Sequence, residues 1–290
     1  MASLVQCPFQ HMGKLRQSLG LFSLTFYGVG VILGAGIYSV IGAAAAEAGQ
    51  VLWMSFALSS VVVLLTALSY AELSTMFPEA GAEYIYLREA FPRHKAVAFV
   101  TSSFVAMSGA ATAATVSIAF AGYLNHFVPF PAPLTAAAVL LLATGVALLG
   151  IQQSSWVNVV FTFIEVGGLV LFIVVGAQNP SFGEALSAEF HPGIFSGAAL
   201  VFFSYLGFEN IANLAEEAKQ PEKNLPRAIL VSIAFATLVY IAVGLSAVAL
   251  LSPEKLSASA YRSPRRWRHT RSRPRAYWVE SRSLPRPTPP

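Results

Sequence analysis

The chain has 290 residues, of which 56% are hydrophobic and only 11% charged, and its mean hydropathy is +0.63. Because a soluble domain carries about 25% charged residues, this composition excludes an ordinary soluble globule and predicts an integral membrane protein with several spans. Aspartate is absent and Cys7 is the single cysteine, which excludes chemistry built on Asp, disulfides within the chain and a multi-cysteine metal site.

The net charge of +4 is the sum of two unlike parts. Residues 261–290 carry nine Arg and one Glu, whereas residues 1–260 carry nine Lys or Arg and thirteen Glu. The basic balance therefore belongs to the last part of the chain, and nucleic-acid binding by the body of the protein is not expected.

Seven apolar segments are long enough, or nearly so, to cross a bilayer core of about 30 Å, which takes roughly 20 helical residues. The sequence thus predicts an all-α membrane domain over residues 21–251, after a cytoplasmic N-terminal segment over residues 1–20. No secretory signal is expected, because the first apolar run begins only at Leu21. The predicted spans are Leu21–Ala45, Val51–Phe77, Val97–Phe127, Pro133–Ile151, Trp156–Ala177, Ile194–Leu214 and Ala228–Leu251.

The Lys and Arg residues predict the orientation of these spans. They precede the first span and occupy the loops after the second and sixth spans, whereas the loops after the first, third and fifth spans contain none. With a cytoplasmic N-terminus, all of them face the cytoplasm, and we expect a multi-pass protein of the plasma (inner) membrane. These cations are Lys14, Arg16, Arg88, Arg93, Lys95, Lys219, Lys223 and Arg227.

Residues 252–290 form a basic tail rich in Pro and Arg. One interpretation is a disordered segment. The other is translation in a wrong frame after a deletion or insertion near Ala260. The second is favoured, because seven spans place the tail outside, whereas a functional basic tail is expected on the cytoplasmic face against anionic lipid.

Glycines in the first span predict an interrupted helix. The stretch GVGVILGAGIY contains Gly34, Ala35 and Gly36 in succession. Close helix packing through small residues is one interpretation. The other is a break that frees backbone N–H and C=O groups, which persists at membrane depth only where it lines a cavity or a ligand site. The half-helix after such a break points its partly positive N-terminus toward an anionic group.

The sixth span has a comparable feature, because Ser204, Gly207 and Glu209 interrupt its apolar run. A packing glycine next to an interfacial Glu is the alternative. Two interrupted helices five spans apart are typical of inverted five-helix repeats that meet at a site near the membrane midplane.

Three stretches resemble the amino acid–polyamine–organocation (APC) superfamily of permeases, whose members share the broken-helix, inverted-repeat fold of the leucine transporter. They are GVGVILGAGIY at 28–38, SYAELSTMFPEAGAEYIYLREAF at 69–91 and FFSYLGFENIANLAEEAKQPEKNLPRAI at 202–229. The resemblance covers about residues 14–255 and implies a secondary active transporter of amino acids or amines that works by alternating access. Such permeases normally have about twelve helices, so we expect an incomplete LeuT-like fold, with the first repeat and two helices of the second, that is truncated and inactive alone.

The resemblance also implies roles for individual residues. Backbone N–H groups after the first break hold the substrate carboxylate, and carbonyl groups of both broken helices receive its ammonium group, with an aromatic ring at Phe203 as a gate. The carboxylate-binding residues are Gly34, Ala35, Gly36 and Ile37. The ammonium-binding residues are Val31, Ile32, Phe203, Ser204 and Leu206, next to the break residue Gly207.

Two glutamates at bilayer depth, Glu165 and Glu209, are candidates for ion coupling, because a buried Glu in a membrane is costly and marks a functional site by default. Some proton-coupled relatives carry a Lys near the position of Glu165, which leaves H⁺ and Na⁺ both open as the coupling ion. We hypothesise that Glu165 titrates during transport; the alternative is a neutral Glu hydrogen-bonded to a neighbouring helix. Glu209 serves either coupling or helix stabilisation, and the structural role is favoured.

Other classes of protein fit less well. A seven-helix receptor or a non-transporting membrane interaction protein is the alternative, but the predicted cytoplasmic N-terminus is opposite to that of receptors. A retinal protein needs a Lys inside its seventh helix, whereas the Lys residues here are in loops and tails. An enzyme is not expected, since His, Cys and Asp are too scarce to build a convergent site. Neither a Walker loop nor an HExxH spacing is present, so no nucleotide, metal or other cofactor is expected.

Overall fold

The computed structural model describes residues 17–125, 127–149, 151–253 and 255–256. Within these residues every regular element is a helix, apart from one isolated β-bridge between Leu19 and Ala218. The helices are α1 (Leu21–Leu33), α2 (Ala35–Ala48), the 3-10 turn η1 (Gly49–Val51), α3 (Leu52–Met76), α4 (Ala82–Ala90), α5 (Lys95–Leu124), α6 (Ala132–Leu148), α7 (Ile151–Ala177), α8 (Ser181–Leu186), α9 (Gly193–Tyr205), α10 (Glu209–Ala212) and α11 (Pro221–Leu250).

All seven predicted apolar segments form helices, and the first and sixth are each divided into two pieces. Five stretches of the described residues are long and apolar enough to cross a membrane: Gly36–Met76, Lys95–Leu124, Trp156–Ala177, Gly193–Ala212 and Pro221–Leu250. The apolar helices Leu21–Leu33 and Ala132–Leu148 are shorter. The first of these is short because the chain leaves the helical path at Gly34.

The boundaries differ most at the last span. Helix α11 begins at Pro221 rather than Ala228, so the second half of the polar connection predicted between the sixth and seventh spans is helical. Proline is well suited to the first helical position, where its missing N–H group has no intrahelical partner to lose. The predicted basic tail lies outside the described residues except for Ser252, Pro253, Lys255 and Leu256, and so does most of the predicted N-terminal segment.

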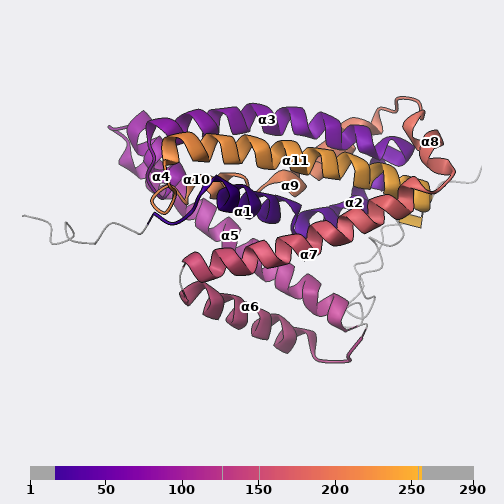
Figure 1. Ribbon diagram of the computed structural model, residues 1–290, viewed down its shortest axis with the longest axis horizontal. Coiled ribbons are helices and arrows are strands. Elements are labelled where there is room, and N and C mark those ends of the chain that lie inside the picture. Colours follow the sequence, from indigo (N-terminus) through magenta and orange to yellow (C-terminus); the bar gives the residue numbers. More distant parts are fainter. Residues whose placement is uncertain (1–16, 126, 150, 254, 257–290) are drawn as a thin grey trace, which may run out of the picture.

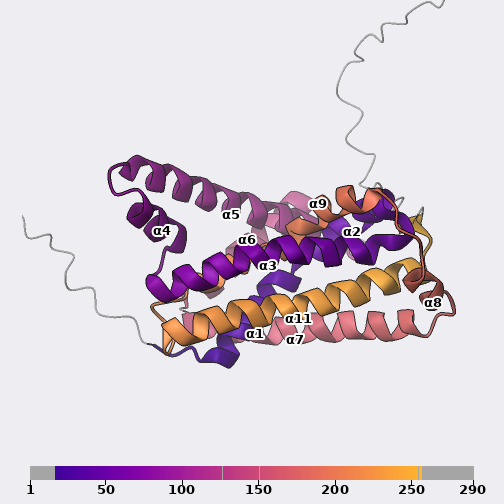
Figure 2. The same ribbon diagram turned by 90° about the horizontal axis from the view of Figure 1, so that it is seen from above.

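Long helices run side by side and enclose the two broken ones. In Figure 1, α3, α11 and α7 follow the long axis of the molecule, and α1 and α2 lie between them. Helix α11 packs against α3, α1 and α7, while α9 packs against α2 and α3. Helices α5 and α6 pack against each other, and Figure 2 shows α5 diverging from α3 toward α4. Helices α7 and α11 thus pack against the first broken helix, and α3 packs against the second.

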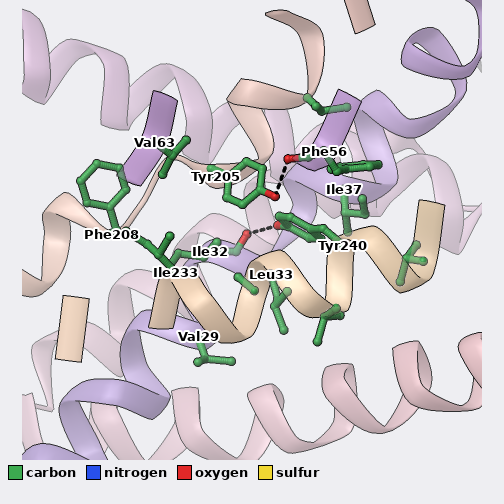
Figure 3. Packing of buried hydrophobic residues seen from close by; sticks show 14 of the residues in the cluster. Val29, Ile32, Leu33, Ile37, Phe56, Val63, Tyr205, Phe208, Ile233 and Tyr240 are labelled. Atoms are coloured by element: carbon green, nitrogen blue, oxygen red, sulfur yellow. Dashed lines mark hydrogen bonds between the residues drawn. The ribbon is translucent and has the colours of Figure 1, made fainter. Parts of the chain in front are cut away.

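Large aromatic residues of three helices meet at the centre of the bundle, among aliphatic side chains (Figure 3). The rings of Tyr205 and Tyr240 meet edge to face with centroids 5.0 Å apart, and the Phe56 ring lies 5.4 Å from that of Tyr240. The Tyr205 hydroxyl donates a hydrogen bond to the Phe56 carbonyl oxygen at 3.1 Å. A buried hydroxyl needs such a partner, so these contacts fix the relative positions of α3, α9 and α11.

Serine hydroxyls join α3 to α9 along their contact. Ser55 donates to the carbonyl oxygen of Ile194 at 3.0 Å, and Ser59 donates to that of Ala198 at 3.1 Å. A Cβ atom on Gly197 would lie 2.5 Å from the Ser55 hydroxyl oxygen, so this approach requires glycine. Small residues and interhelical hydrogen bonds of this kind are what hold helices together in a membrane.

The end of the bundle that carries α4 is tied together by contacts between distant segments. The Lys219 N–H donates to the carbonyl oxygen of Leu19 at 2.8 Å, which joins the residues before α1 to those before α11. The side-chain oxygen of Asn213 accepts hydrogen bonds from the N–H groups of Gly81 at 3.1 Å and Ala82 at 2.9 Å, and so caps α4. The described cations of the predicted cytoplasmic loops all belong to segments at this end (Figure 1); they are Arg88, Arg93, Lys95, Lys219, Lys223 and Arg227.

Helix α4 packs its aromatic side against the end of α3. The rings of Tyr86 and Tyr70 meet edge to face with centroids 6.1 Å apart, and the Tyr70 hydroxyl donates to a carboxylate oxygen of Glu83 at 3.2 Å. Burial, together with the nearby Glu83 carboxylate, raises the pKa of Tyr86 to about 12. The Tyr86 phenol is therefore neutral at physiological pH and serves in packing.

Candidate functional site

The first helix break lies at Gly34. Helix α1 ends at Leu33, and Gly34 has φ −43° and ψ −154°, which turns the chain before α2 begins at Ala35. The sequence predicted an interruption over Gly34–Gly36, but Ala35 and Gly36 already belong to α2. The unusual backbone angles of Gly34 alone are enough to interrupt the helix. They remove the main-chain hydrogen bonds that would otherwise join the last turn of α1 to the first turn of α2. The N–H groups of the first turn of α2 lack intrahelical partners and carry the positive end of its dipole.

The second break lies between α9 and α10. Leu206 is extended, with φ −62° and ψ 145°, and Gly207 has φ +123°, a conformation that favours glycine. The N–H group of Gly207 donates a hydrogen bond to a carboxylate oxygen of Glu209 at 2.8 Å. Glu209 therefore stabilises the chain where it leaves the helical path.

The two breaks touch each other. A Cβ atom on Gly36 would lie 2.9 Å from the Cα atom of Ser204, and a Cβ atom on Gly207 would lie 2.6 Å from a methyl carbon of Val31. Only glycine allows the backbones to approach this closely without displacement. The structure thus brings together two regions that the sequence singled out separately.

Tyr240 of α11 joins the breaks, and the sequence reasoning missed it. Its hydroxyl lies within hydrogen-bonding distance of the carbonyl oxygen of Ile32 on α1 (Figure 3). It also lies 2.8 Å from the carbonyl oxygen of Ser204 on α9. A phenol has one proton, so it donates to one of these carbonyls at a time. A lone Tyr in the apolar run ATLVYIAVG was the available signal, since a buried hydroxyl at membrane depth needs a partner.

The hydroxyl of Ser204 lacks a hydrogen-bond partner among the described residues, although the residue is 1% exposed. A buried hydroxyl without a partner is unfavourable by about 1–3 kcal/mol. This group lies where the two breaks meet, because the Cα atom of Ser204 is the close neighbour of Gly36.

The other predicted residues divide into two sets. Ile32 and Ile37 are buried to 1% exposure, so their side chains pack in the core and only their main-chain groups are available to a solute. Phe203 and Leu206 are exposed, at 49% and 42%, and lie outside the core of the described structure. The Phe203 ring therefore lies outside the buried cluster, and its role as a gate stays a prediction.

Glu165 lies on the face of α7 that packs against α1. One turn earlier, a Cβ atom on Gly30 would lie 2.0 Å from the Thr162 hydroxyl oxygen. The Glu165 side chain is partly buried. Within the described part of the chain it forms neither a hydrogen bond nor an ion pair.

The arrangement offers both signs of partial charge in one place. The N-terminus of α2 presents N–H groups, and the C-terminal ends of α1 and α9 present carbonyl groups. Helix ends of opposite polarity can stabilise a negative and a positive group without a full counter-charge in the membrane. Among the described residues, no group of three or more His, Cys, Asp or Glu side chains converges as a metal site would require.

Comparison with known proteins gives a family. Residues 19–263 match the family model described as amino acid permease. The chain is 31% identical to the branched-chain amino acid permease of Bacillus subtilis (strain 168) over 253 residues, which are 79% of this chain and 54% of the relative. It is 32% identical to the methylthioribose transporter of the same organism over 84% of this chain and 57% of the relative. It is 34% identical to the chloroplastic cationic amino acid transporter 9 of Arabidopsis thaliana over 79% of this chain and 45% of the relative.

The chain thus spans about half the length of these curated relatives. The matched region includes both helix breaks and α11.

Proposed function

Since this chain belongs to the amino acid permease family, we propose that it forms the solute-binding half of a secondary active transporter for amino acids or amines. The observation that carries the proposal is the close approach of two broken helices, whose ends Tyr240 joins. Secondary transporters bind solutes near the membrane midplane at discontinuous helices of this kind.

In this proposal the α-carboxylate of the solute lies against the N–H groups of Ala35, Gly36 and Ile37, beside Gly34. The positive end of the α2 dipole favours a negative group there. The α-ammonium group of the solute lies against free lone pairs of carbonyl oxygens at the ends of α1 and α9. A carbonyl oxygen that already accepts one hydrogen bond can accept a second. Those carbonyls belong to Val31, Ile32, Phe203, Ser204 and Leu206.

Transport proceeds by alternating access, in which the halves of the broken helices move relative to α3 and α11. We propose H⁺ or Na⁺ as the coupling ion and Glu165 and Glu209 as the two carboxylates available to it. The gathering of Lys and Arg at the α4 end supports a cytoplasmic N-terminus in the plasma (inner) membrane.

We also propose that the 290-residue chain does not transport alone. Alternating access needs a moving unit and a scaffold from both repeats, and this chain spans about half the length of its relatives. Saturable amino acid uptake into liposomes that contain only the purified chain would contradict this part of the proposal.

The solute site itself is tested by Ser204→Ala in the purified chain in lipid nanodiscs. Because the Ser204 hydroxyl has no partner among the described residues, its removal should leave the melting temperature unchanged or raise it. Calorimetric titration with a panel of amino acids should show binding to the unsubstituted chain and about tenfold weaker binding to the variant, which corresponds to one lost hydrogen bond.

The matched control is Ser59→Ala, whose hydroxyl donates to the Ala198 carbonyl oxygen away from the breaks. This variant should lower the melting temperature and leave the affinity unchanged. If no amino acid binds to the unsubstituted chain, or if Ser204→Ala binds as tightly as the unsubstituted chain, the proposed site is wrong.

A further inference from the structure

The turn between α4 and α5 carries three basic side chains in succession, those of Arg93, His94 and Lys95, and all three are exposed. Figure 2 shows this turn at one end of the molecule. The N–H group of His94 donates a hydrogen bond to the carbonyl oxygen of Phe91 at 2.9 Å, which closes the turn. Two permanently charged side chains, those of Arg93 and Lys95, therefore stand close together on a short, hydrogen-bonded connection.

Neither of these two cations has a counter-charge in the part of the chain that the structure describes. Arg88, the preceding cation in the chain, is paired with Glu89 at 3.0 Å. By contrast, the side chains of Arg93 and Lys95 form no ion pair or hydrogen bond with a described residue. Residues 91–99 also contain no Glu, so nothing in the turn itself balances their charge.

The other group of cations at this end of the bundle is balanced by carboxylates. Residues 216–227 contain three Lys or Arg side chains and three Glu side chains; they are Glu216, Glu217, Lys219, Glu222, Lys223 and Arg227. Positive charge is thus unbalanced on the α4–α5 turn and balanced in the segment that leads into α11. A negatively charged partner is expected at the first of these places.

Exposed apolar side chains continue from the turn along α5. Val97, Val100 and Phe104 follow one another at three and four positions, so they lie on one face of the helix, and all three are exposed. Helix α5 packs against α4 and α6 and is long and apolar enough to cross a membrane. Because its first residue is Lys95, this apolar face begins next to the two cations and continues toward the hydrocarbon core.

This combination of charge and apolar surface fits an anionic phospholipid. Guanidinium and ammonium groups bind phosphate through charge-assisted hydrogen bonds. Basic side chains that flank a membrane helix are attracted to anionic headgroups. The apolar face of α5 offers contacts to acyl chains, which a free phosphate or a nucleotide does not have.

We propose that the α4–α5 turn binds the negatively charged headgroup of a phospholipid. Arg93 and Lys95 contact the phosphate group, and the acyl chains lie along Val97, Val100 and Phe104. Such a lipid fixes the start of α5 at the level of the headgroups. The turn is separate from the helix breaks, so the inference holds whether or not the chain binds an amino acid.

The test compares phosphatidylglycerol with phosphatidylcholine of the same acyl chains, because the first lipid is anionic and the second carries no net charge. Native mass spectrometry of the purified chain in a neutral detergent measures the affinity for each lipid at constant pH and salt. Phosphatidylglycerol should bind at least about tenfold more tightly. The double variant Arg93→Gln with Lys95→Gln should lose this preference by weakening phosphatidylglycerol binding alone.

The matched control is Lys219→Gln with Lys223→Gln, which removes the same charge from the balanced segment and should keep the preference. Equal affinities of the unsubstituted chain for the two lipids overturn the inference, and so does a preference that survives without Arg93 and Lys95. An equal loss in both double variants also overturns it, because the attraction is then to the net charge of the protein. If glycerol phosphate, a headgroup without acyl chains, displaces phosphatidylglycerol at equal concentration, the turn binds a soluble phosphate and the inference is wrong.

Discussion

The hydroxyl oxygen of Tyr240 lies 2.8 Å from the carbonyl oxygen of Ser204, the penultimate residue of α9. The same hydroxyl contacts the carbonyl oxygen of Ile32, the penultimate residue of α1. One side chain of an unbroken helix thus joins the ends of two broken ones. Since the phenol has a single proton, it can donate to only one of these two carbonyl oxygens at a time.

Tyr240→Phe should therefore weaken both stability and solute binding. The ring packing against Phe56 and Tyr205 is retained, but two buried carbonyl oxygens lose their shared donor. We expect a loss of about 1 kcal/mol in the free energy of unfolding, within the range for interhelical hydrogen bonds in membranes. Thermal melts of the chain in nanodiscs and calorimetric titration with amino acids measure the two effects.

The control is Tyr205→Phe, which removes a hydroxyl that donates to the Phe56 carbonyl oxygen on the unbroken α3. It should lose comparable stability and keep the amino acid affinity. If Tyr240→Phe melts and binds as the unsubstituted chain does, the hydroxyl does not join the breaks in the membrane.

Gly36→Ala should force the breaks apart. The added methyl group would lie 2.9 Å from the Cα atom of Ser204, and a backbone atom cannot yield as a flexible side chain can. Overpacking of this kind costs about 1–3 kcal/mol, so the melting temperature should fall and amino acid binding should be lost.

Gly109→Ala is the matched control, because Gly109 lies within α5 and a Cβ atom there would meet nothing within 4 Å. It should leave the melting temperature unchanged or raise it, since Ala is a better helix former than Gly. Equal melting temperatures and affinities for the Gly36→Ala variant and the unsubstituted chain would show that the two backbones do not meet there.

The helices and both breaks could be predicted from the sequence because their signals are local. Apolar runs give the spans, and the glycines at positions 34 and 207 mark the places where the chain leaves the helical path. Tyr240 could not be assigned a role in this way, because its partner Ile32 is 208 positions away. The sequence shows that a buried hydroxyl needs an acceptor and does not show which helix supplies it.

The capping of α4 was missed for the same reason. Asn213 accepts a hydrogen bond from the N–H group of Ala82, which lies 131 positions away, so neither segment alone contains a capping signal. Glycine at the N-cap position, Gly81, lacks a side-chain acceptor of its own, and a distant residue supplies it.

Asn213→Ala should consequently loosen α4 with little effect on the rest of the bundle. The N–H groups of Gly81 and Ala82 lose their common acceptor, at a cost of about 1 kcal/mol. Hydrogen–deuterium exchange should become faster at α4 and stay unchanged in α3 and α11.

Asn213→Asp is the control, because it keeps an acceptor oxygen and places a negative charge at the positive end of the helix. The exchange of α4 in this variant should match that in the unsubstituted chain. Equal protection of α4 in all three forms would show that the cap does not hold this helix.

Glu209 differs from Glu165 because it has a partner of its own. The Gly207 N–H donates to its carboxylate at 2.8 Å, at the residue where φ is positive, so we expect Glu209 to stabilise the second break.

Glu209→Gln retains an acceptor oxygen and should keep the melting temperature and the amino acid affinity close to those of the unsubstituted chain. Glu209→Ala removes the acceptor and should cost about 1.5–3 kcal/mol, the usual value for a hydrogen bond to a charged group, with loss of binding. Glu189→Ala, an exposed carboxylate of the loop before α9, controls for the loss of charge alone and should change neither quantity. If Glu209→Gln already loses binding as Glu209→Ala does, the negative charge itself is required, and Glu209 then serves a coupling ion rather than the shape of the break.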